Sequence, residues 1–248
     1  MILLLDAGNT SVKWGLDDDG SIVSGGSFMH RGNNVDDLAG QAWSELQMPA
    51  GVYIANVAGV ETGRKLSDWV ERQWGIPPVF IASTARACGV TNAYATPGQL
   101  GVDRWAALIG AHSQGRGARQ CIVDCGTAIT LDMLTADGVH QGGLILPGVE
   151  MMKHMLLKNT AVKNASGTQR FAKLFAMGTE DAINSGALYM AAAAIDRIAV
   201  DMGAVPGTRL DVVVTGGDAS RILTLLACPA RHDPELVLKG LAMLAGGH

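Results

Sequence analysis

The sequence predicts an α/β protein built from two similar domains, and three observations support this fold class. The chain has 248 residues, 48% of them hydrophobic and 17% charged, which suits two compact halves with a core each. Short apolar runs alternate with helical patterns along the chain. A strand and turn pattern near the start also recurs near the middle.

The recurring pattern is a short apolar run followed by a turn that contains Asp and Gly. Residues 2–5 lead into the turn 6–10 (DAGNT), and residues 121–123 lead into 124–128 (DCGTA). Each turn runs on into another apolar stretch. Both copies therefore predict a β-hairpin, and its glycine lets an anion approach the backbone closely.

The alignment of the two copies predicts the domain organisation. When Asp6 is aligned with Asp124, Leu16 is aligned with Leu134, so we expect two related domains that face one another. The small and polar stretch 113–119 is the best linker candidate. We therefore expect one domain at residues 1–115 and a second at residues 116–248.

The first half continues with alternating strand and helix patterns. The expected elements are a strand at 52–57, a helix at 61–74, a strand at 78–82, an irregular stretch at 83–101 and a helix at 103–112. This order predicts a sheet covered by helices.

The second half repeats that alternation after its hairpin. The expected elements are a strand at 143–146, a Met-rich helix at 150–157, a helix at 180–202 capped by Thr179, a strand at 210–214 and a helix at 235–245. The 210–214 strand leads into a glycine-rich turn at 215–219.

Composition narrows the function classes. Nineteen Lys and Arg residues against 23 Asp and Glu give a net charge of −4, so nothing favours nucleic acid or an anionic membrane as a partner. The four cysteines include no C-x-x-C pair, so we expect free, buried thiols and neither a zinc site nor disulfides. The apolar run 1–5 is too short for a signal peptide, which leads us to expect a cytoplasmic protein.

The phosphate-binding motifs narrow the fold further. The chain contains no Gly-Lys dipeptide, which excludes a P-loop, and no G-x-G-x-x-G after a strand. It has two carboxylate-plus-glycine hairpins and a Thr-Gly-Gly-Asp turn at 215–218. This set is typical of the actin, hexokinase and Hsp70 architecture: two ribonuclease-H-like domains with mixed sheets flanked by helices, and an ATP cleft between them.

The first hairpin suits a nucleotide phosphate and a cation. The backbone N–H groups of Gly8, Asn9 and Thr10 could donate to phosphate oxygens, whereas the Asp6 carboxylate would repel them unless a cation lies between. Asp6 therefore implies Mg²⁺, held partly through water. A lone D-x-G is usually just a structural turn, but two copies make that interpretation weaker.

Asp103 permits two interpretations that the sequence leaves open. It could be the N-cap of the helix that follows, since Asp accepts hydrogen bonds from first-turn N–H groups. It could also be a general base that takes the proton of an acceptor hydroxyl, while Arg104 attracts an anionic group of the acceptor.

Six motifs, in order, resemble those of one family, the type III pantothenate kinases, which carry out the first step of coenzyme A synthesis. They are residues 6–10, Tyr94 with Pro97 and 100–104, residues 124–128, 142–148, 178–179 and 215–218. The resemblance covers most of the chain, although 21–45 and 161–171 match no family motif.

The resemblance implies a role for each matched residue. Asp103 would be the catalytic base, Asp6 would hold Mg²⁺, and Asp124 would lie at a monovalent cation site for K⁺ or NH₄⁺. Pantothenate would be held by Tyr94, Gly101, Val102, Asp103, Arg104 and Thr179. ATP would be held by Asp6, Ala7, Gly8, Asn9, Thr10, Ser11, Val12, Lys13, Gly126, Thr127, Gly216 and Gly217. The family also implies a homodimer, in which Met151, Met152 and Met155 lie either at the surface or in the core.

Two other functions remain as alternatives at this point. One is a kinase of the same architecture for another small anionic hydroxy compound. The other is a nucleotide-dependent regulatory protein of the same fold, although the adjacent Asp103 and Arg104 argue against it, since a pure switch needs no base for a second substrate.

Overall fold

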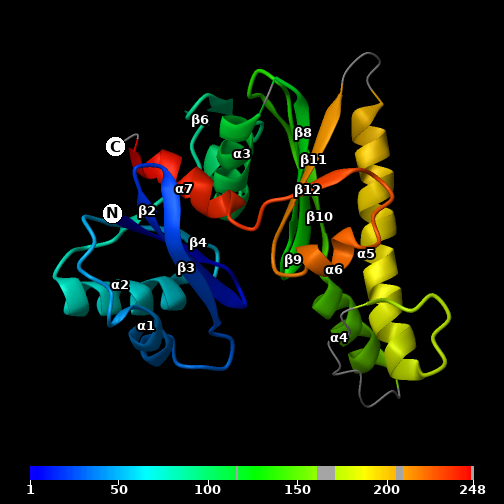
Figure 1. The fold of residues 1–248 in the computed structure, drawn as a ribbon, viewed down its shortest axis with the longest axis horizontal. Coiled ribbons are helices and arrows are strands. Elements are labelled where there is room, and N and C mark those ends of the chain that lie inside the picture. Colours follow the sequence, from blue (N-terminus) through cyan, green and yellow to red (C-terminus); the bar gives the residue numbers. More distant parts are fainter. Residues whose placement is uncertain (116, 161–170, 205–208, 247–248) are drawn as a thin grey trace. The chain divides into compact units, whose positions relative to one another are not determined.

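The structure is a computed structural model that describes residues 1–115, 117–160, 171–204 and 209–246 (Figure 1). The chain forms two compact units. Unit 1 is made of Met1–Gln114, Asp137–Val139 and Glu235–His248, and unit 2 of Gly115–Ala136 and His140–Pro234. The division expected from the sequence differs from this one in three places. Gly115 belongs to unit 2, and the chain segments 137–139 and 235–246 belong to unit 1.

Unit 1 contains a five-stranded sheet in the order β3-β2-β1-β4-β5. Its central strand is completely buried at Leu3, Leu4 and Leu5, which is why the sequence shows an unbroken apolar run there. Strand β1 is antiparallel to β2 and parallel to β4. The strands are β1 (Ile2–Ala7), β2 (Ser11–Asp18), β3 (Ser21–Met29), β4 (Val52–Asn56) and β5 (Val79–Phe80).

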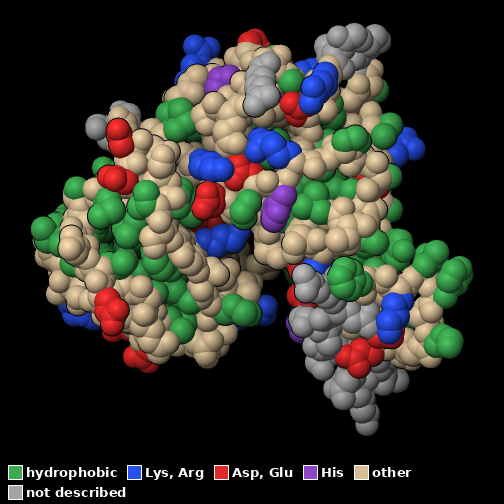
Figure 2. Space-filling view, in the orientation of Figure 1, with side chains coloured by type: hydrophobic (Ala, Val, Ile, Leu, Met, Phe, Trp, Pro, Cys, Tyr) green, Lys and Arg blue, Asp and Glu red, His purple; other side chains and the backbone are tan. Residues whose placement is uncertain are grey.

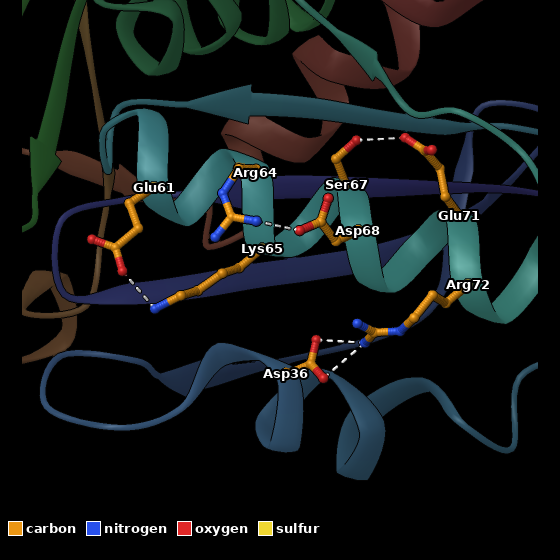
Figure 3. Close-up of polar contacts among 8 residues, drawn as sticks. All are labelled: Asp36, Glu61, Arg64, Lys65, Ser67, Asp68, Glu71 and Arg72. Carbon is orange, nitrogen blue, oxygen red and sulfur yellow. Dashed lines mark hydrogen bonds and ion pairs between the residues drawn. The ribbon is translucent and has the colours of Figure 1, made fainter.

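Helices α1 (Val35–Trp43) and α2 (Val60–Trp74) pack on one face of this sheet. The core there includes Trp43 and Trp69, whose rings meet edge to face at 5.4 Å between centroids. The two helices are also joined by an ion pair, in which an Arg72 nitrogen lies 2.6 Å and 2.7 Å from the Asp36 oxygens (Figure 3).

Helices α3 (Val102–Gln114) and α7 (Leu236–Gly246) also belong to unit 1. They approach each other so closely that a Cβ at Gly240 would collide with the Ala106 backbone, and a Cβ at Gly110 would collide with the Leu236 backbone. This glycine-mediated packing assigns the C-terminal helix to unit 1. The stretch before α3 holds β6 (Arg86–Ala87), β7 (Val90–Thr91) and the 3₁₀ helix η1 (Pro97–Gln99).

Unit 2 repeats the sheet of unit 1, in the order β10-β9-β8-β11-β12 and with the same strand directions. A long helix, α5, packs on it through Leu188, Ala191 and Ile195. The elements are β8 (Arg119–Cys125), β9 (Ala128–Leu134), β10 (His140–Pro147), α4 (Val149–Asn159), α5 (Thr179–Gly203), β11 (Leu210–Thr215), α6 (Ala219–Leu223) and β12 (Ala230–His232).

The two hairpins differ in turn length. Three residues separate β1 from β2, but only two separate β8 from β9. Consequently Leu16 lies opposite Leu3, whereas the corresponding partner of Cys121 is Met133. The alignment of Leu16 with Leu134 is therefore wrong by one residue, because the sequence comparison took the two turns to be equally long.

The described helices include none that is long and apolar enough to cross a membrane.

Candidate active site

The turn between β1 and β2 holds the first set of candidate ATP-binding residues. The Gly8 N–H donates to the Ser11 carbonyl at 3.0 Å and closes the turn, so this N–H is already used within the turn, contrary to the expectation that it binds phosphate. Asp6 lies opposite Lys13 in the register of the hairpin. Ala7 and Val12 are buried and anchor the turn in the core.

His30 was not found by sequence analysis, yet it contacts the same turn twice. Its ring Nε2 lies 2.7 Å from the Gly8 carbonyl oxygen. Its backbone N–H donates to the Thr10 carbonyl at 3.1 Å. His30 and Gly8 are 22 positions apart in the sequence, and no local sequence pattern predicts such a contact.

Tyr94 and Arg104 form a pair next to Asp103. The Arg104 guanidinium donates to the Tyr94 hydroxyl at 3.0 Å and lies 5.8 Å from the centre of its ring. Arg104 is only 6% exposed, so its charge is held in place by the surrounding protein. The Asn92 side chain accepts from the Tyr94 N–H at 2.9 Å and fixes the backbone there.

Asp103 lies inside the first turn of α3 and is not its N-cap. The helix begins at Val102, and the Gly101 carbonyl accepts the first helical bond from Trp105 at 2.9 Å. The Asp103 Oδ1 atom accepts from the Arg104 N–H at 2.8 Å. A Cβ at Gly101 would lie 2.5 Å from that oxygen, so glycine leaves the room that the carboxylate occupies.

In unit 2, Asp124 lies beside the glycine-rich turn that follows β11. A Cβ at Gly216 would collide with Asp124 Oδ1 and the Cys125 backbone, and Gly216 has a φ of +97°, which favours glycine. Thr215 lies opposite Asp124 in the parallel strand pair. The Thr215 side-chain oxygen is buried and has no hydrogen-bond partner among the described residues.

The turn of Gly126 and Thr127 is packed against the start of α4. The Gly148 N–H donates to the Thr127 carbonyl at 3.2 Å, and a Cβ at Gly148 would collide with both turn carbonyls. A further backbone hydrogen bond fixes the nearby turn at 216–218: the Asp218 N–H donates to the Cys125 carbonyl at 2.9 Å. Backbone therefore packs on backbone at both turns.

A network of four charged side chains links α4 to the 216–218 turn. The Lys153 ammonium donates to Glu150 at 2.9 Å, and Arg221 lies 2.8 Å from Asp218 and 3.8 Å from Glu150. Lys153 is only 2% exposed. The attraction between these two positive and two negative side chains thus holds α4 and α6 together.

Thr179 lies at the start of α5. The helix is capped by Gly178, not by Thr179, since the Gly178 carbonyl accepts from the Ala182 N–H at 2.9 Å. Thr179 lines an apolar groove of about 1080 Å³ together with Met152, Met155 and Met190.

The methionines of α4 are divided between core and surface. Met152 is 9% exposed, whereas Met151 and Met155 are 44% and 60% exposed. The segment before α5 adds Phe175 and Met177, and apolar side chains lie on the surface at the lower right of Figure 2, where Figure 1 places α4 and the start of α5.

All four cysteines are free, and Cys121 and Cys125 are buried in the core of unit 2. Burial raises the pKa of Cys121 to about 12. Burial, with smaller effects from the Asp124 and Asp218 charges, raises the pKa of Cys125 still further. These thiols stay protonated at neutral pH and serve as core side chains.

Known proteins are similar to this chain over most of its length. The family model of type III pantothenate kinases matches residues 2–201. A type III pantothenate kinase from Nitrosococcus oceani is 42% identical over 99% of this chain and 94% of its own length. One from Burkholderia lata is 40% identical over 98% of this chain and 94% of its own length.

Solved structures at low sequence identity share this fold, which is of the actin and hexokinase type. A Campylobacter jejuni protein assigned to the Baf family of transcriptional activators is similar with a TM-score of 0.60, at 20% identity over 99% of this chain and 98% of its own. The activator of the 2-hydroxyisocaproyl-CoA dehydratase from Clostridium difficile has a TM-score of 0.57, at 13% identity over 98% of this chain and 93% of its own. Taken with the sequence relatives, these findings show that the chain belongs to the type III pantothenate kinase family.

Proposed function

We propose that the chain transfers the γ-phosphoryl group of ATP to the primary hydroxyl of pantothenate, giving 4′-phosphopantothenate for coenzyme A synthesis. The observation that carries this proposal is the family match over residues 2–201, together with relatives about 40% identical over nearly the whole chain. The chain is an ATP-dependent kinase. Nothing in the site favours a regulatory function in its place.

The two hairpin turns would bind the nucleotide phosphates. In unit 1 the Asn9 and Ser11 N–H groups would donate to phosphate oxygens, because the Gly8 N–H is used within the turn. In unit 2, Gly126 and Thr127 would line the phosphate site. Gly216 and Gly217 would leave room for the nucleoside. The structure supports this use because Gly217 has open space where a side chain would lie.

The single carboxylate of Asp6 fits Mg²⁺, which usually takes one or two carboxylates plus phosphate oxygens and water. Among the described residues no group of three or more His, Cys, Asp or Glu side chains is placed to hold a metal without such help. When bound, the ion would neutralise charge on the transferring phosphoryl group. Asp6 would hold it next to the turn.

Asp103 would act as the base and Arg104 as the anchor of the acceptor. As the pantothenate hydroxyl oxygen bonds to the γ-phosphorus, its proton passes to Asp103 and ADP leaves. Pantothenate carries a carboxylate, and the fixed guanidinium of Arg104, with the Tyr94 hydroxyl beside it, would attract this group. Gly101 and Val102 would contact the same substrate.

Asp124 and Thr215 would bind a monovalent cation, K⁺ or NH₄⁺. The buried Thr215 oxygen has no hydrogen-bond partner among the described residues, and both it and the Asp124 carboxylate opposite it could serve as oxygen ligands. A cation there would compensate a hydroxyl that otherwise lies desolvated and unpaired.

The apolar groove beside Thr179 would be covered by a second copy of this chain. Phe175 is 86% exposed and Met177 95%, and apolar surface of this extent next to a groove is typical of an interface. Sedimentation of the purified chain should give a dimer, and Met177→Glu should shift it toward the monomer. A monomer at all concentrations would contradict this part of the proposal.

The experiment that tests the function uses the purified chain with ATP, Mg²⁺, K⁺ and pantothenate. Equal amounts of ADP and a phosphorylated pantothenate are expected. Phosphorylation of a sugar or another hydroxy acid, with no product from pantothenate, would contradict the substrate assignment. Binding of ATP without turnover of any acceptor would contradict the kinase function.

A further inference from the structure

We infer that His30 is a positioning residue of the phosphate-binding turn, one that orients the backbone N–H groups of residues 9 and 11 toward ATP. This inference rests on the proposed use of the turn at residues 8–10. His30 follows β3 directly, and the end of that strand pairs with β2 at Ser11↔Met29, so the imidazole reaches the turn from the neighbouring strand.

The contacts of His30 fix the direction of two peptide units. The Gly8 carbonyl oxygen can only accept a hydrogen bond, so His30 Nε2 carries a proton and donates at 2.7 Å. The Thr10 carbonyl accepts from the His30 N–H at 3.1 Å and from the Arg31 N–H at 3.4 Å. Both turn carbonyls are therefore held by residues 30 and 31.

Holding these carbonyls determines where the next N–H groups point. In a planar trans peptide unit the C=O and the following N–H point in opposite directions. The Gly8 carbonyl shares its peptide unit with the Asn9 N–H, and the Thr10 carbonyl shares its unit with the Ser11 N–H. With the carbonyls turned toward His30, these two N–H groups point to the opposite side, where a phosphate oxygen would find aligned donors.

The contact of the His30 ring with the Gly8 carbonyl depends on which side chain stands at position 30. The bond to Thr10 uses only backbone and would survive substitution, whereas the bond to Gly8 needs a donor at the distance of Nε2 from the backbone. A glutamine amide nitrogen lies at that distance, and an asparagine amide is one bond shorter. His30→Gln and His30→Asn therefore form a matched pair that differs in reach.

The test is steady-state kinetics of the full chain with ATP and pantothenate varied separately. His30→Asn should raise the KM for ATP about 3- to 10-fold, the usual value of one neutral hydrogen bond, with little change in the KM for pantothenate. His30→Gln should stay within about twofold of the unmodified chain. Asn33→Ala is the control, since Asn33 donates to the Met29 carbonyl at 3.1 Å in the same segment without contacting the turn.

Three results would overturn the inference: an unchanged KM for ATP in His30→Asn, equal losses in His30→Asn and His30→Gln, or the same loss in Asn33→Ala. If the unmodified chain does not phosphorylate pantothenate, the proposed function fails by itself. The inference about His30 is then decided by calorimetric titration with ATP, in which only His30→Asn should raise the dissociation constant, again about 3- to 10-fold.

Discussion

Thr215 lies directly opposite Asp124 across the parallel strands β11 and β8, and its buried side-chain oxygen has no hydrogen-bond partner among the described residues. Residues opposite each other in neighbouring strands direct their side chains to the same face of the sheet. A carboxylate and a desolvated hydroxyl therefore share one face at the edge of the candidate nucleotide site. Such a pair suits a cation with oxygen ligands.

Thr215→Val should weaken activation by K⁺ while the fold is retained, because valine keeps the shape of threonine and removes only the oxygen. We expect the K⁺ concentration for half-maximal activity to rise at least about tenfold, the effect of losing roughly 1.4 kcal/mol of binding. The measurement is activity against K⁺ concentration at constant ionic strength. Unchanged K⁺ dependence, or full activity of the unmodified chain in Na⁺ alone, would contradict a cation site here.

Gly216→Ala should destabilise unit 2, because the new Cβ collides with Asp124 and the Cys125 backbone and φ is positive. The expected loss is about 1–3 kcal/mol, measured from the midpoint of urea unfolding. Gly217→Ala is the matched control for stability, since nothing lies within 4 Å of its Cβ position. Equal midpoints for the two variants would mean that the close approach of Gly216 to Asp124 is not important for the fold.

Asp196 should make the stability of unit 2 depend on pH. Burial raises the pKa of its carboxyl, but hydrogen bonds from the Ala227 and Cys228 N–H groups outweigh burial and hold the pKa below its ordinary value. A lowered pKa stabilises the folded state above the unfolded pKa, and this contribution is lost as the pH falls through the folded pKa.

Asp196→Asn should therefore cost about 1 kcal/mol at pH 7, a modest value because solvent screens a half-exposed carboxylate, and the difference should narrow in acid. Urea unfolding at several pH values measures it. Asp201→Asn is the control, since its ion pair with Arg197 is exposed and screened by solvent and should contribute little to stability. A cost that is the same at all pH values would contradict the linkage.

Gly240→Ala should destabilise unit 1, because its Cβ would overlap the Ala106 backbone and force α3 and α7 apart. We expect a loss of about 1–3 kcal/mol in urea unfolding. Gly186→Ala, in a helix where nothing lies within 4 Å, should be neutral or slightly stabilising. If Gly240→Ala is harmless, the C-terminal helix is not an integral part of unit 1.

The strands and helices that the sequence predicted have local causes. Strands β1, β8 and β11 are short apolar runs that end in turns with Asp and Gly, and helix α2 has a clear 3.6-residue period that ends at Gly75 in the left-handed conformation. Their positions were therefore predicted to within a few residues.

The features that the sequence did not predict depend on contacts between distant residues. Helix α7 belongs to unit 1 because Gly110 and Gly240 allow it to pack closely against α3. A glycine in the sequence does not indicate which residue more than 120 positions away will contact it. The difference in turn length became visible only through strand register. His30 was missed because its bond to Gly8 spans 22 positions, in a stretch that resembles no family motif.

The most direct test of the account is the turnover number of Asp103→Asn with ATP and pantothenate. Asparagine preserves the size of the side chain and removes the base, so kcat should fall by about 10² to 10⁴-fold, while the KM for ATP and the urea midpoint stay close to those of the unmodified chain. A loss of less than about threefold in a folded variant would contradict the account and leave Asp103 as a structural residue of the first turn of α3.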